Sequence, residues 1–446
     1  MDMTRVRPFI YFTFAVGGIF GLLTAFQNQA AQQTDRPNII LIMADDMGYE
    51  CLKANGALTY ETPFLDRMGR EGVRFTHCFS QPLCTPSRVK IMTGQYNYRN
   101  YEYFGYLNEN QKTFGNLLKS AGYATAIVGK WQLNGLAYDL PGYQDSLRPR
   151  KFGFDEHCLW QLTEARQEGE RFANPLISQN GELLDRDPDA YGPDIFCDYA
   201  LDFIGRHQTH PFFLYYPMVL VHNPFVPTPD SEAWSDPNRR YEKDTAHFTD
   251  MMAYTDKIVA KIAARLDQLG LDNTLLIFTA DNGTNTSIRT VTNRRTVQGA
   301  KGNTILDGTH VPMVARWPAK LKEPLTYEGL IEFSDFYPTF AEIVGDKEHV
   351  DGQSFLGIFT SVQHQPRSSI FVHYDPRWSK NVDKYRNQFS QTQRYKLYRN
   401  GAFFDIINDP LEMGQLNTMT KDQEVAKQLL QSVLNETPLL PAPIED

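Results

Sequence analysis

Short apolar runs that each lead into a polar residue constrain the fold of this chain more than any other feature. The run 38–43 carries almost only large aliphatic side chains, and Asp45-Asp46 follows it. An unbroken run of this kind predicts a strand buried on both faces of a sheet. The comparable runs are 124–128, 211–216, 275–279 and 311–317.

Segments with helical spacing separate these runs. Phe114, Leu117 and Leu118 recur at helical intervals within 113–121, and Gly122 follows where a helix commonly ends. Strands that alternate with helices predict an α/β domain, with a large mixed, mostly parallel sheet covered by helices on both faces. The other predicted helices of this domain lie within 63–68 and 244–269.

The sequence changes character from about residue 350. Short aromatic runs predict strands over 370–372 and 395–398, and an apolar stripe predicts a helix over 422–434. These elements predict a smaller C-terminal domain with an antiparallel sheet and a helix. The predicted divisions of the chain are therefore 1–31, 36–348 and 349–446.

The N-terminal segment 1–31 has the layout of a secretory signal. Arg5 and Arg7 precede an apolar run over 8–26, and polar residues follow it. The run is also long enough for an anchor that stays in the membrane. We expect an exported protein, periplasmic or secreted, which contacts a membrane only if this segment is not cleaved.

Composition excludes several classes of protein. A hydrophobic content of 41% indicates a packed globular chain, and a net charge of −9 with no basic stripe argues against a nucleic-acid partner. Five scattered cysteines form neither a disulfide framework nor a CxxC zinc pair. An anionic substrate stays compatible with the charge, because a local cluster of cations and metal can bind it.

Two acidic pairs follow two of the buried runs. Asp45 and Asp46 follow the first run, and Asp281 and Asn282 follow 275–279. Carboxylate and amide oxygens are the ligands that Ca²⁺ and Mg²⁺ prefer. Either pair alone is better explained as a turn or a helix cap. Because the carboxyl ends of parallel strands meet at one edge of a sheet, the two pairs together predict a metal site there.

The segment Cys84-Thr85-Pro86-Ser87-Arg88 supplies a candidate nucleophile. Pro86 suits the first turn of a helix, so Cys84 is predicted to lie just ahead of a helix N-terminus, where negative charge is favoured. Arg88 adds a planar cation one turn later, suited to an oxyanion. A buried structural cysteine explains the five residues equally well.

Three further side chains lie near the predicted edge. Lys130 ends the run 124–128, His222 follows 211–216, and Lys301 lies in a glycine-rich stretch. The lysines could bind an oxyanion, and His222 could donate a proton. Solvated surface lysines and a structural loop histidine are the alternatives.

These segments together resemble the formylglycine-dependent type I sulfatases of the alkaline-phosphatase superfamily. The likeness extends over nearly everything after residue 35. The segments that carry it are 36–46, 62–67, 74–76, 84–88, 93–94, 129–131, 221–224, 279–283, 301–318, 395–397, 404–406 and 409–410. The resemblance implies that 36–348 is a sulfatase catalytic domain.

The resemblance also implies roles. A maturation enzyme would oxidise Cys84 to formylglycine, its hydrate would attack sulfur in line, and the sulfated hemiacetal would collapse to release sulfate. Arg88 would steady the hydrate, and His222 or Lys301 would protonate the leaving group. The implied ligands of Ca²⁺ (or Mg²⁺) are Asp45, Asp46, Cys84, Asp281 and Asn282. The implied substrate-binding residues are Lys130, Gln132, His222 and Lys301.

Two positions depart from the family pattern. Gln132 stands where the family has a histidine that drives hemiacetal collapse, and an amide cannot act as a base at neutral pH. The stretch 307–310 replaces a Glu-Gly-Gly run and an arginine, and His310 is left without a role.

The sequence therefore predicts a sulfuric ester hydrolase that acts on a sulfated poly- or oligosaccharide. A phosphate or phosphonate ester hydrolase of the same superfamily is one alternative. A relative that binds sulfated glycan with little turnover is another, and Gln132 is its support. Four aromatic residues could stack on sugar faces, if they do not simply pack within their loop: Tyr101, Tyr103, Phe104 and Tyr106. A second set of candidates for a substrate wall is Tyr374, Asp375, Arg377 and Trp378.

Overall fold

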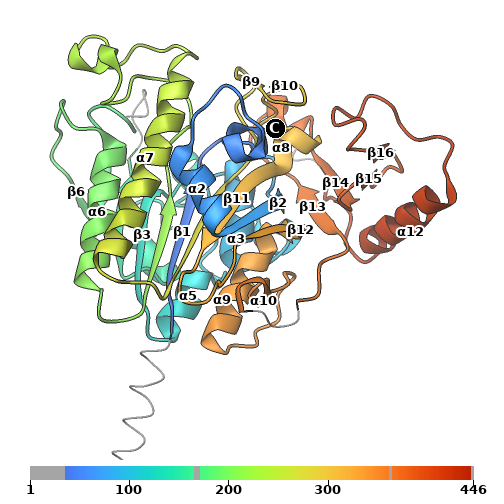
Figure 1. The fold of residues 1–446 in the computed structure, drawn as a ribbon, viewed down its shortest axis with the longest axis horizontal. Coiled ribbons are helices and arrows are strands. Elements are labelled where there is room, and N and C mark those ends of the chain that lie inside the picture. Colours follow the sequence, from blue (N-terminus) through green and yellow to red (C-terminus); the bar gives the residue numbers. More distant parts are fainter. Residues whose placement is uncertain (1–35, 165–170, 361–363, 443–446) are drawn as a thin grey trace, which may run out of the picture. The chain divides into compact units, whose positions relative to one another are not determined.

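A ten-stranded sheet organises the larger part of the protein (Figure 1). The computed structural model describes residues 36–164, 171–360 and 364–442, so the predicted signal segment 1–31 lies outside the described residues. In spatial order the strands are β12 (Leu325–Glu332), β2 (Val73–Phe79), β11 (His310–Arg316), β8 (Thr274–Ala280), β1 (Asn38–Ala44), β7 (Phe212–Pro217), β3 (Ala124–Lys130), β4 (Glu156–Trp160), β5 (Ile177–Gln179) and β6 (Glu182–Leu183).

The centre of this sheet is parallel. Strand β1 pairs in parallel with β7 and β8, and β3 pairs in parallel with β7 and β4. Every residue of β1, β7 and β8 is buried, as expected of strands covered on both faces. The carboxyl ends of β8, β1, β7 and β3 therefore share one edge, while β11 runs the other way beside β8.

Two groups of helices cover this sheet. In one group α2 and α6 contact α7, and in the other α3, α5 and α9 contact one another. The longer helices are α2 (Pro63–Glu71), α3 (Cys84–Thr93), α5 (Phe114–Ser120), α6 (Gly192–Arg206), α7 (His247–Gln268) and α9 (Phe336–Val344). Single-turn helices are α4 (Asn97–Asn100), α8 (Leu306–Thr309), α10 (Gly357–Thr360) and α11 (Lys380–Asp383). The 3₁₀ turns are η1 (Tyr49–Cys51), η2 (Lys53–Asn55), η3 (Leu136–Tyr138), η4 (Arg148–Phe152), η5 (Glu232–Ser235) and η6 (Phe333–Asp335).

The C-terminal part forms a separate four-stranded antiparallel sheet. Its strands are β13 (Ile370–Tyr374), β14 (Asn387–Gln391), β15 (Tyr395–Tyr398) and β16 (Phe403–Asp405), and β9 (Arg289–Val291) pairs with β10 (Thr296–Gln298) elsewhere. Helix α12 (Lys421–Asn435) packs on β14 and β15, as the red helix in Figure 1 shows. The ammonium of Lys396 donates to the carbonyl of Thr304, which ties this sheet to the large domain.

The predicted fold class is confirmed, with differences in single elements. The predicted strands and helices are present. Elements that were not predicted include the strands β2, β4, β5, β6, β9, β10, β12 and β14 and the helices α6 and α9. Helix α3 begins at Cys84 itself, whereas the sequence placed this residue just ahead of the helix. The division between residues 348 and 349 stays a prediction. Among the described residues, none of the helices has the length and apolar character needed to cross a membrane.

Candidate active site

The first acidic pair lies where β1 leaves the sheet. Asp46 adopts a left-handed backbone conformation, with φ of 63°, which aspartate tolerates better than most residues. The backbone of Asp45 exchanges two hydrogen bonds with Leu220 and Val221, at 2.7 and 2.8 Å. These contacts hold the β1 end against the segment after β7, and both carboxylates are fully buried.

Asp45 is surrounded by cations. Its two carboxylate oxygens accept from the ammonium of Lys130, at 2.9 and 2.8 Å, and Arg88 Nη2 lies 3.6 Å away. Burial by itself raises the pKa of Asp45, but the charges of Lys130 and Arg88 outweigh it and hold the pKa well below its ordinary value. Asp45 is therefore a carboxylate at neutral pH.

Asp281 joins helix α3 to the loop after β1. One of its oxygens accepts from Arg88 Nη2 at 2.7 Å, and the other accepts from the backbone N–H of Asp46 at 3.0 Å. Burial and the neighbouring charge of Asp45 raise the pKa of Asp281, although Arg88 opposes them. The two buried carboxylates repel each other, and Arg88 Nη2, 2.7 Å from Asp281 and 3.6 Å from Asp45, offsets part of this repulsion.

Asp46 gathers the remaining predicted residues. Lys301 Nζ donates to its Oδ2 at 2.6 Å, Asn282 Nδ2 donates to its Oδ1 at 2.9 Å, and His222 Nε2 lies 3.7 Å from Oδ2. Burial, together with Lys301 and Arg171, holds the pKa of His222 well below its ordinary value. His222 Nδ1 lies 2.6 Å from the carbonyl oxygen of Asn223, so the neutral ring carries its proton there and its bare Nε2 faces Asp46.

The donor set fits a hard cation. Asp45, Asp46 and His222 offer ligand atoms that all lie within 4.8 Å of one another. The amide oxygen of Asn282 is buried and has no hydrogen-bond partner among the described residues. An unpartnered buried carbonyl oxygen beside carboxylates is what a Ca²⁺ or Mg²⁺ ligand needs.

Cys84 opens α3 beside this cluster. Its side chain is buried, and its sulfur lies 3.6 Å from the amide oxygen of Gln132, which has a left-handed φ of 52°. Burial raises the pKa of the Cys84 thiol, although Lys130 and Lys301 lower it. An unmodified Cys84 is therefore a neutral thiol, which is a poor nucleophile.

Sequence reasoning missed Arg171, because it belongs to no motif. Its Nη1 lies 3.8 Å from Asp45 Oδ2, and its guanidinium stacks on Trp160 at 4.2 Å. The sequence also missed Glu50, which accepts from Thr284 Oγ1 at 2.6 Å and so ties the loop after Asp46 to the loop after Asn282. His310, left without a role, stacks on Tyr49 at 3.9 Å and contacts the Thr76 carbonyl at 2.9 Å.

The two candidate aromatic segments lie together near Cys84. Phe104 stacks on Trp378 at 4.4 Å, and the Tyr101 hydroxyl donates to the Pro376 carbonyl at 2.5 Å. Tyr101, Phe104, Tyr106, Tyr374 and Asp375 are buried, so most of the proposed wall packs within its loops. Tyr103 and Trp378, which are 39% and 45% exposed, can still meet a ligand.

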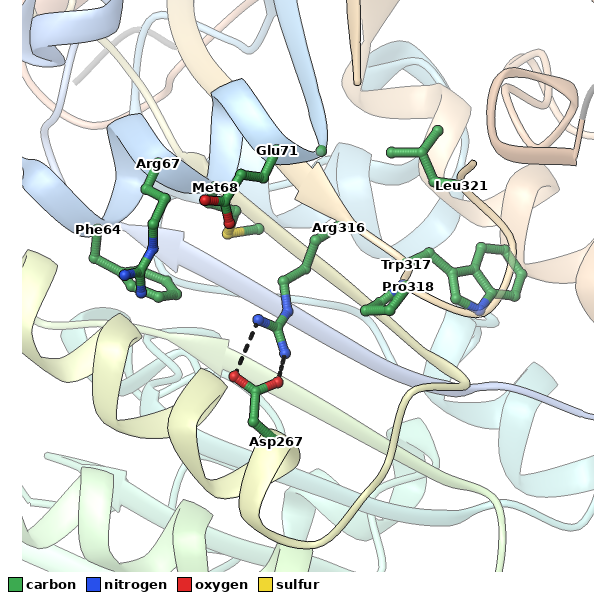
Figure 2. Close-up of a pocket in the computed structure, with 10 residues that line it drawn as sticks. Phe64, Arg67, Met68, Glu71, Asp267, Arg316, Trp317, Pro318 and Leu321 are labelled. Carbon is green, nitrogen blue, oxygen red and sulfur yellow. Dashed lines mark hydrogen bonds and ion pairs between the residues drawn. The ribbon is translucent and has the colours of Figure 1, made fainter. Parts of the chain in front are cut away.

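A separate hollow of about 480 Å³ lies away from this cluster (Figure 2). Arg316, which pairs with Asp267 across it, is in register with Leu276 near the start of β8. The acidic pairs follow the opposite ends of β1 and β8. The hollow therefore lies at the other edge of the sheet, and it contains none of the predicted site residues.

Comparison with known proteins decides the family. A model of the sulfatase family matches residues 37–346, and a model described as N-sulphoglucosamine sulphohydrolase, C-terminal, matches 305–437. The chain belongs to the sulfatase family. It is a type I sulfatase of the alkaline-phosphatase superfamily, and its enzyme class is sulfuric ester hydrolase.

Among relatives of this sulfatase, the N-acetylgalactosamine-6-sulfatase of Canis lupus familiaris is 28% identical over 86% of this chain and 77% of its own length. The N-acetylgalactosamine-6-O-sulfatase of Bacteroides thetaiotaomicron is 28% identical over 71% of this chain and 74% of its own length.

Two solved structures share the fold. One is a protein in complex with its substrate D-glucosamine-2-N,6-O-disulfate, with a TM-score of 0.71 and 22% identity over 90% of this chain and 98% of that one. The other is a phosphonate monoester hydrolase of Agrobacterium radiobacter, with a TM-score of 0.63 and 17% identity over 90% and 95%. At these identities the likeness extends to the fold alone.

Proposed function

We propose that this sulfatase hydrolyses a sulfate ester on a poly- or oligosaccharide, with a formylglycine made from Cys84 and a bound Ca²⁺ (or Mg²⁺). One observation carries the proposal. Cys84 opens a helix whose Arg88 contacts Asp281, at an edge where Lys130, Lys301 and His222 surround Asp45 and Asp46. A candidate nucleophile close to cations and to carboxylate oxygens supports this proposal.

Asp45, Asp46, Asp281 and Asn282 are the proposed protein ligands of the metal, together with the modified Cys84. When bound, the cation would polarise the sulfate and offset negative charge as the ester breaks. The formylglycine hydrate would supply the hydroxyl nucleophile that the neutral Cys84 thiol does not provide. Arg88 would orient that group through its fixed contacts to Asp281 and to the Lys130 carbonyl, at 2.7 and 3.1 Å.

The substrate's sulfate would lie among the cations. Once a metal shares Asp45 and Asp46, the ammonium groups of Lys130 and Lys301 become available to sulfate oxygens. The leaving sugar oxygen needs a proton, from His222 or Lys301. Asp46 raises the pKa of Lys301 above its ordinary value even though burial lowers it, whereas His222 is neutral, so Lys301 holds the available proton.

Two observations support a sugar as the leaving group. Relatives at 27–28% identity are named for 6-sulfated N-acetylgalactosamine. Trp378 and Tyr103 are exposed on segments that pack near Cys84, where an aromatic face can stack on a sugar ring. We therefore propose a 6-sulfated hexosamine as the first substrate to test.

The proposal includes the route to the mature enzyme. A formylglycine-generating enzyme would act on Cys84 before folding, because the folded side chain is buried. We propose export to the periplasm or the outside, in line with the layout of segment 1–31.

Gln132 favours one second candidate, a sulfated-glycan-binding protein with little turnover. Its amide lies against Cys84 but cannot take the proton that a histidine would take. The Gln132→His variant separates the two candidates. A slow wild type that becomes a fast enzyme on this change would support the binding role, and a wild type already fast would exclude it.

The test of the proposal is a substrate panel. The protein is coexpressed with a formylglycine-generating enzyme, and the modification of Cys84 is checked by peptide mass. Sulfate release is measured from an aryl sulfate and from sulfated hexosamines, and phosphate or phosphonate release from matched esters, with Cys84→Ala as control. We expect sulfate release by the wild type alone; preferred cleavage of the phosphorus esters would contradict the proposal.

A further inference from the structure

Arg171 is a buried cation whose hydrogen-bonding capacity is unused. The residue is 8% exposed, and its Nε and Nη1 have no hydrogen-bond partner within the described part of the chain. A guanidinium keeps its charge at any pH the protein meets and presents five donors in a fixed plane. Leaving such donors unpaired inside a protein is costly unless a ligand satisfies them.

The fold holds this side chain in place from two directions. Trp160, the last residue of β4, lies in register with Lys130 of β3, and the Arg171 guanidinium stacks on its ring at 4.2 Å. On the backbone side, Gly192 at the start of α6 donates to the Phe172 carbonyl at 2.8 Å. A Cβ at Gly192 would lie 2.2 Å from the Arg171 carbonyl oxygen, so only glycine permits this approach.

The guanidinium faces the same carboxylate as Lys130 but does not bond to it. Nη1 lies 3.8 Å from Asp45 Oδ2, beyond hydrogen-bond distance, while Lys130 occupies both oxygens of Asp45. Lys130 uses two of the about four lone-pair sites of Asp45, and Arg171 bonds to none of them. A metal bound to Asp45 would take a further site, and Arg171 would then need another anion.

We infer that Arg171 is a substrate-binding residue that donates to oxygens of the sulfate group being transferred. The inference rests on the proposed function, and it extends the set of Lys130, His222 and Lys301 by a residue outside every sequence motif. A sulfate among these groups gives Arg171 the oxygen acceptors that it lacks. A guanidinium binds such an oxyanion through two parallel hydrogen bonds.

The test uses inorganic sulfate and the full-length, Ca²⁺-loaded protein with Cys84 unmodified, so that no turnover is required. Calorimetry gives the dissociation constant of sulfate for the wild type, Arg171→Met and Arg171→Lys. Arg171→Met keeps an unbranched side chain that can pack on Trp160, and Arg171→Lys keeps the positive charge but lacks the planar guanidinium. Arg240→Met is the matched control, because Arg240 also stacks on a tryptophan, Trp234 at 5.0 Å, and bonds to residues outside the site.

Arg171→Met is expected to weaken sulfate binding about 10- to 100-fold, because a charged hydrogen-bonding group is lost. Arg171→Lys should weaken it less, and Arg240→Met should leave it unchanged. In the matured enzyme, kcat/KM for an aryl sulfate and for a sulfated hexosamine should fall by the same factor, because both share the sulfate. Should Arg171→Met not fold, Arg171→Lys and Arg171→Gln carry the same comparison.

If the wild type and Arg171→Met bind sulfate equally tightly, the inference is wrong, but the proposed sulfatase activity is unaffected. Loss confined to the sugar substrate would also overturn it, because Arg171 would then contact another anionic group. A changed Ca²⁺ affinity with unchanged sulfate affinity would assign Arg171 to the orientation of Asp45 instead. A wild type that neither binds nor releases sulfate would overturn the proposed function itself.

Discussion

Two clusters of buried charge flank helix α3, and they differ in how completely their groups are paired. The site cluster is defined by Asp45, Asp46, Asp281, Arg88, Lys130, Arg171, His222, Lys301 and Asn282. The structural cluster is defined by Lys90, Glu332, Asp335 and Arg367. Both are largely shielded from water, so both pay a desolvation cost that only good pairing offsets.

The structural cluster is closed. Lys90 Nζ donates to Glu332 Oε2 at 2.5 Å and to the Phe371 carbonyl at 3.0 Å. Arg367 bonds to both acids, at 2.5 Å each, and backbone N–H groups complete Asp335. Two cations balance two anions, and every charged side chain has a hydrogen-bond partner.

The site cluster is open. Its four permanent cations exceed its three carboxylates. Four of its atoms have no hydrogen-bond partner among the described residues: Arg88 Nε, Arg171 Nε, Arg171 Nη1 and the Asn282 oxygen. Unpaired donors and an unpaired acceptor side by side match a site that takes an anion and a metal. The comparison teaches that incomplete pairing, rather than burial of charge, distinguishes the functional cluster from the structural one.

The largest effect is expected where the open cluster loses a proposed metal ligand. Asp281→Asn would keep the shape of the side chain but remove a charge that Arg88 uses and that the proposed metal would use. We expect kcat/KM for an aryl sulfate to fall on the order of 10³-fold or more, because metal stabilisation of a transition state amounts to several kcal/mol. Steady-state kinetics at saturating Ca²⁺ measure this, and a loss under tenfold would break the comparison.

Glu332→Gln should act on stability instead. It leaves Lys90 and Arg367 buried without a full counter-charge, so the free energy of unfolding should fall by about 3–5 kcal/mol. Urea unfolding measures the change. The double variant Lys90→Met/Glu332→Gln removes the stranded ammonium and should regain part of the loss. A marked fall in kcat/KM of the folded Glu332→Gln protein would contradict a purely structural role for this cluster.

Lys301→Ala should show which group protonates the leaving oxygen. Because Lys301 is also proposed to contact the sulfate, kcat/KM should fall for both substrates. With the neutral His222 unable to donate, we expect the fall to be about 10²-fold larger for a sugar sulfate than for a nitrophenyl sulfate, whose leaving group needs no proton. His222→Ala should lower kcat/KM by an equal factor for the sugar sulfate and for the nitrophenyl sulfate. The reverse pattern would assign the proton to His222.

The smallest effect concerns Glu50, which lies beside the site and has no cation bonded to it within the described part of the chain. Burial, helped by the charge of Asp307, raises the pKa of Glu50 to about 7. The pKa of Glu50 is higher in the folded than in the unfolded state, so its protonation stabilises the fold. This contribution to the free energy of unfolding is full below about pH 4.5 and is lost as the pH rises through 7. Glu50→Gln should therefore be about 1–3 kcal/mol more stable than the wild type at pH 8 and equal at pH 4. Equal stability at both pH values would contradict this.

The edge of the sheet could be predicted because parallel strands end together. Asp45, Lys130 and Asp281 each follow a run so apolar that its burial was evident, and their convergence follows from topology. Strand β2 was missed because Arg74, Thr76 and His77 leave it no continuous apolar run, although its first four residues alternate as in a half-buried strand. Strand β12 was missed because its first half is largely exposed and polar.

Which side chains pair with one another inside each cluster could not be predicted from the sequence. Arg171 contacts Asp45 across 126 residues, and no local pattern distinguishes it from a surface arginine. Lys90 lies in a helix whose apolar and polar residues are mixed around the axis, so its complete burial leaves no periodic signal. Which donors stay unpaired depends on distances that sequence spacing does not contain.

The central claim is that the open cluster is built for a cation, and calcium binding tests it most directly. Ca²⁺ would be titrated calorimetrically into metal-free protein and into the Asp45→Asn and Glu332→Gln variants. We predict one Ca²⁺ per chain for the wild type and Glu332→Gln, and loss of binding in Asp45→Asn. A wild type that binds neither Ca²⁺ nor Mg²⁺, or an Asp45→Asn variant that binds as tightly as the wild type, would contradict the account.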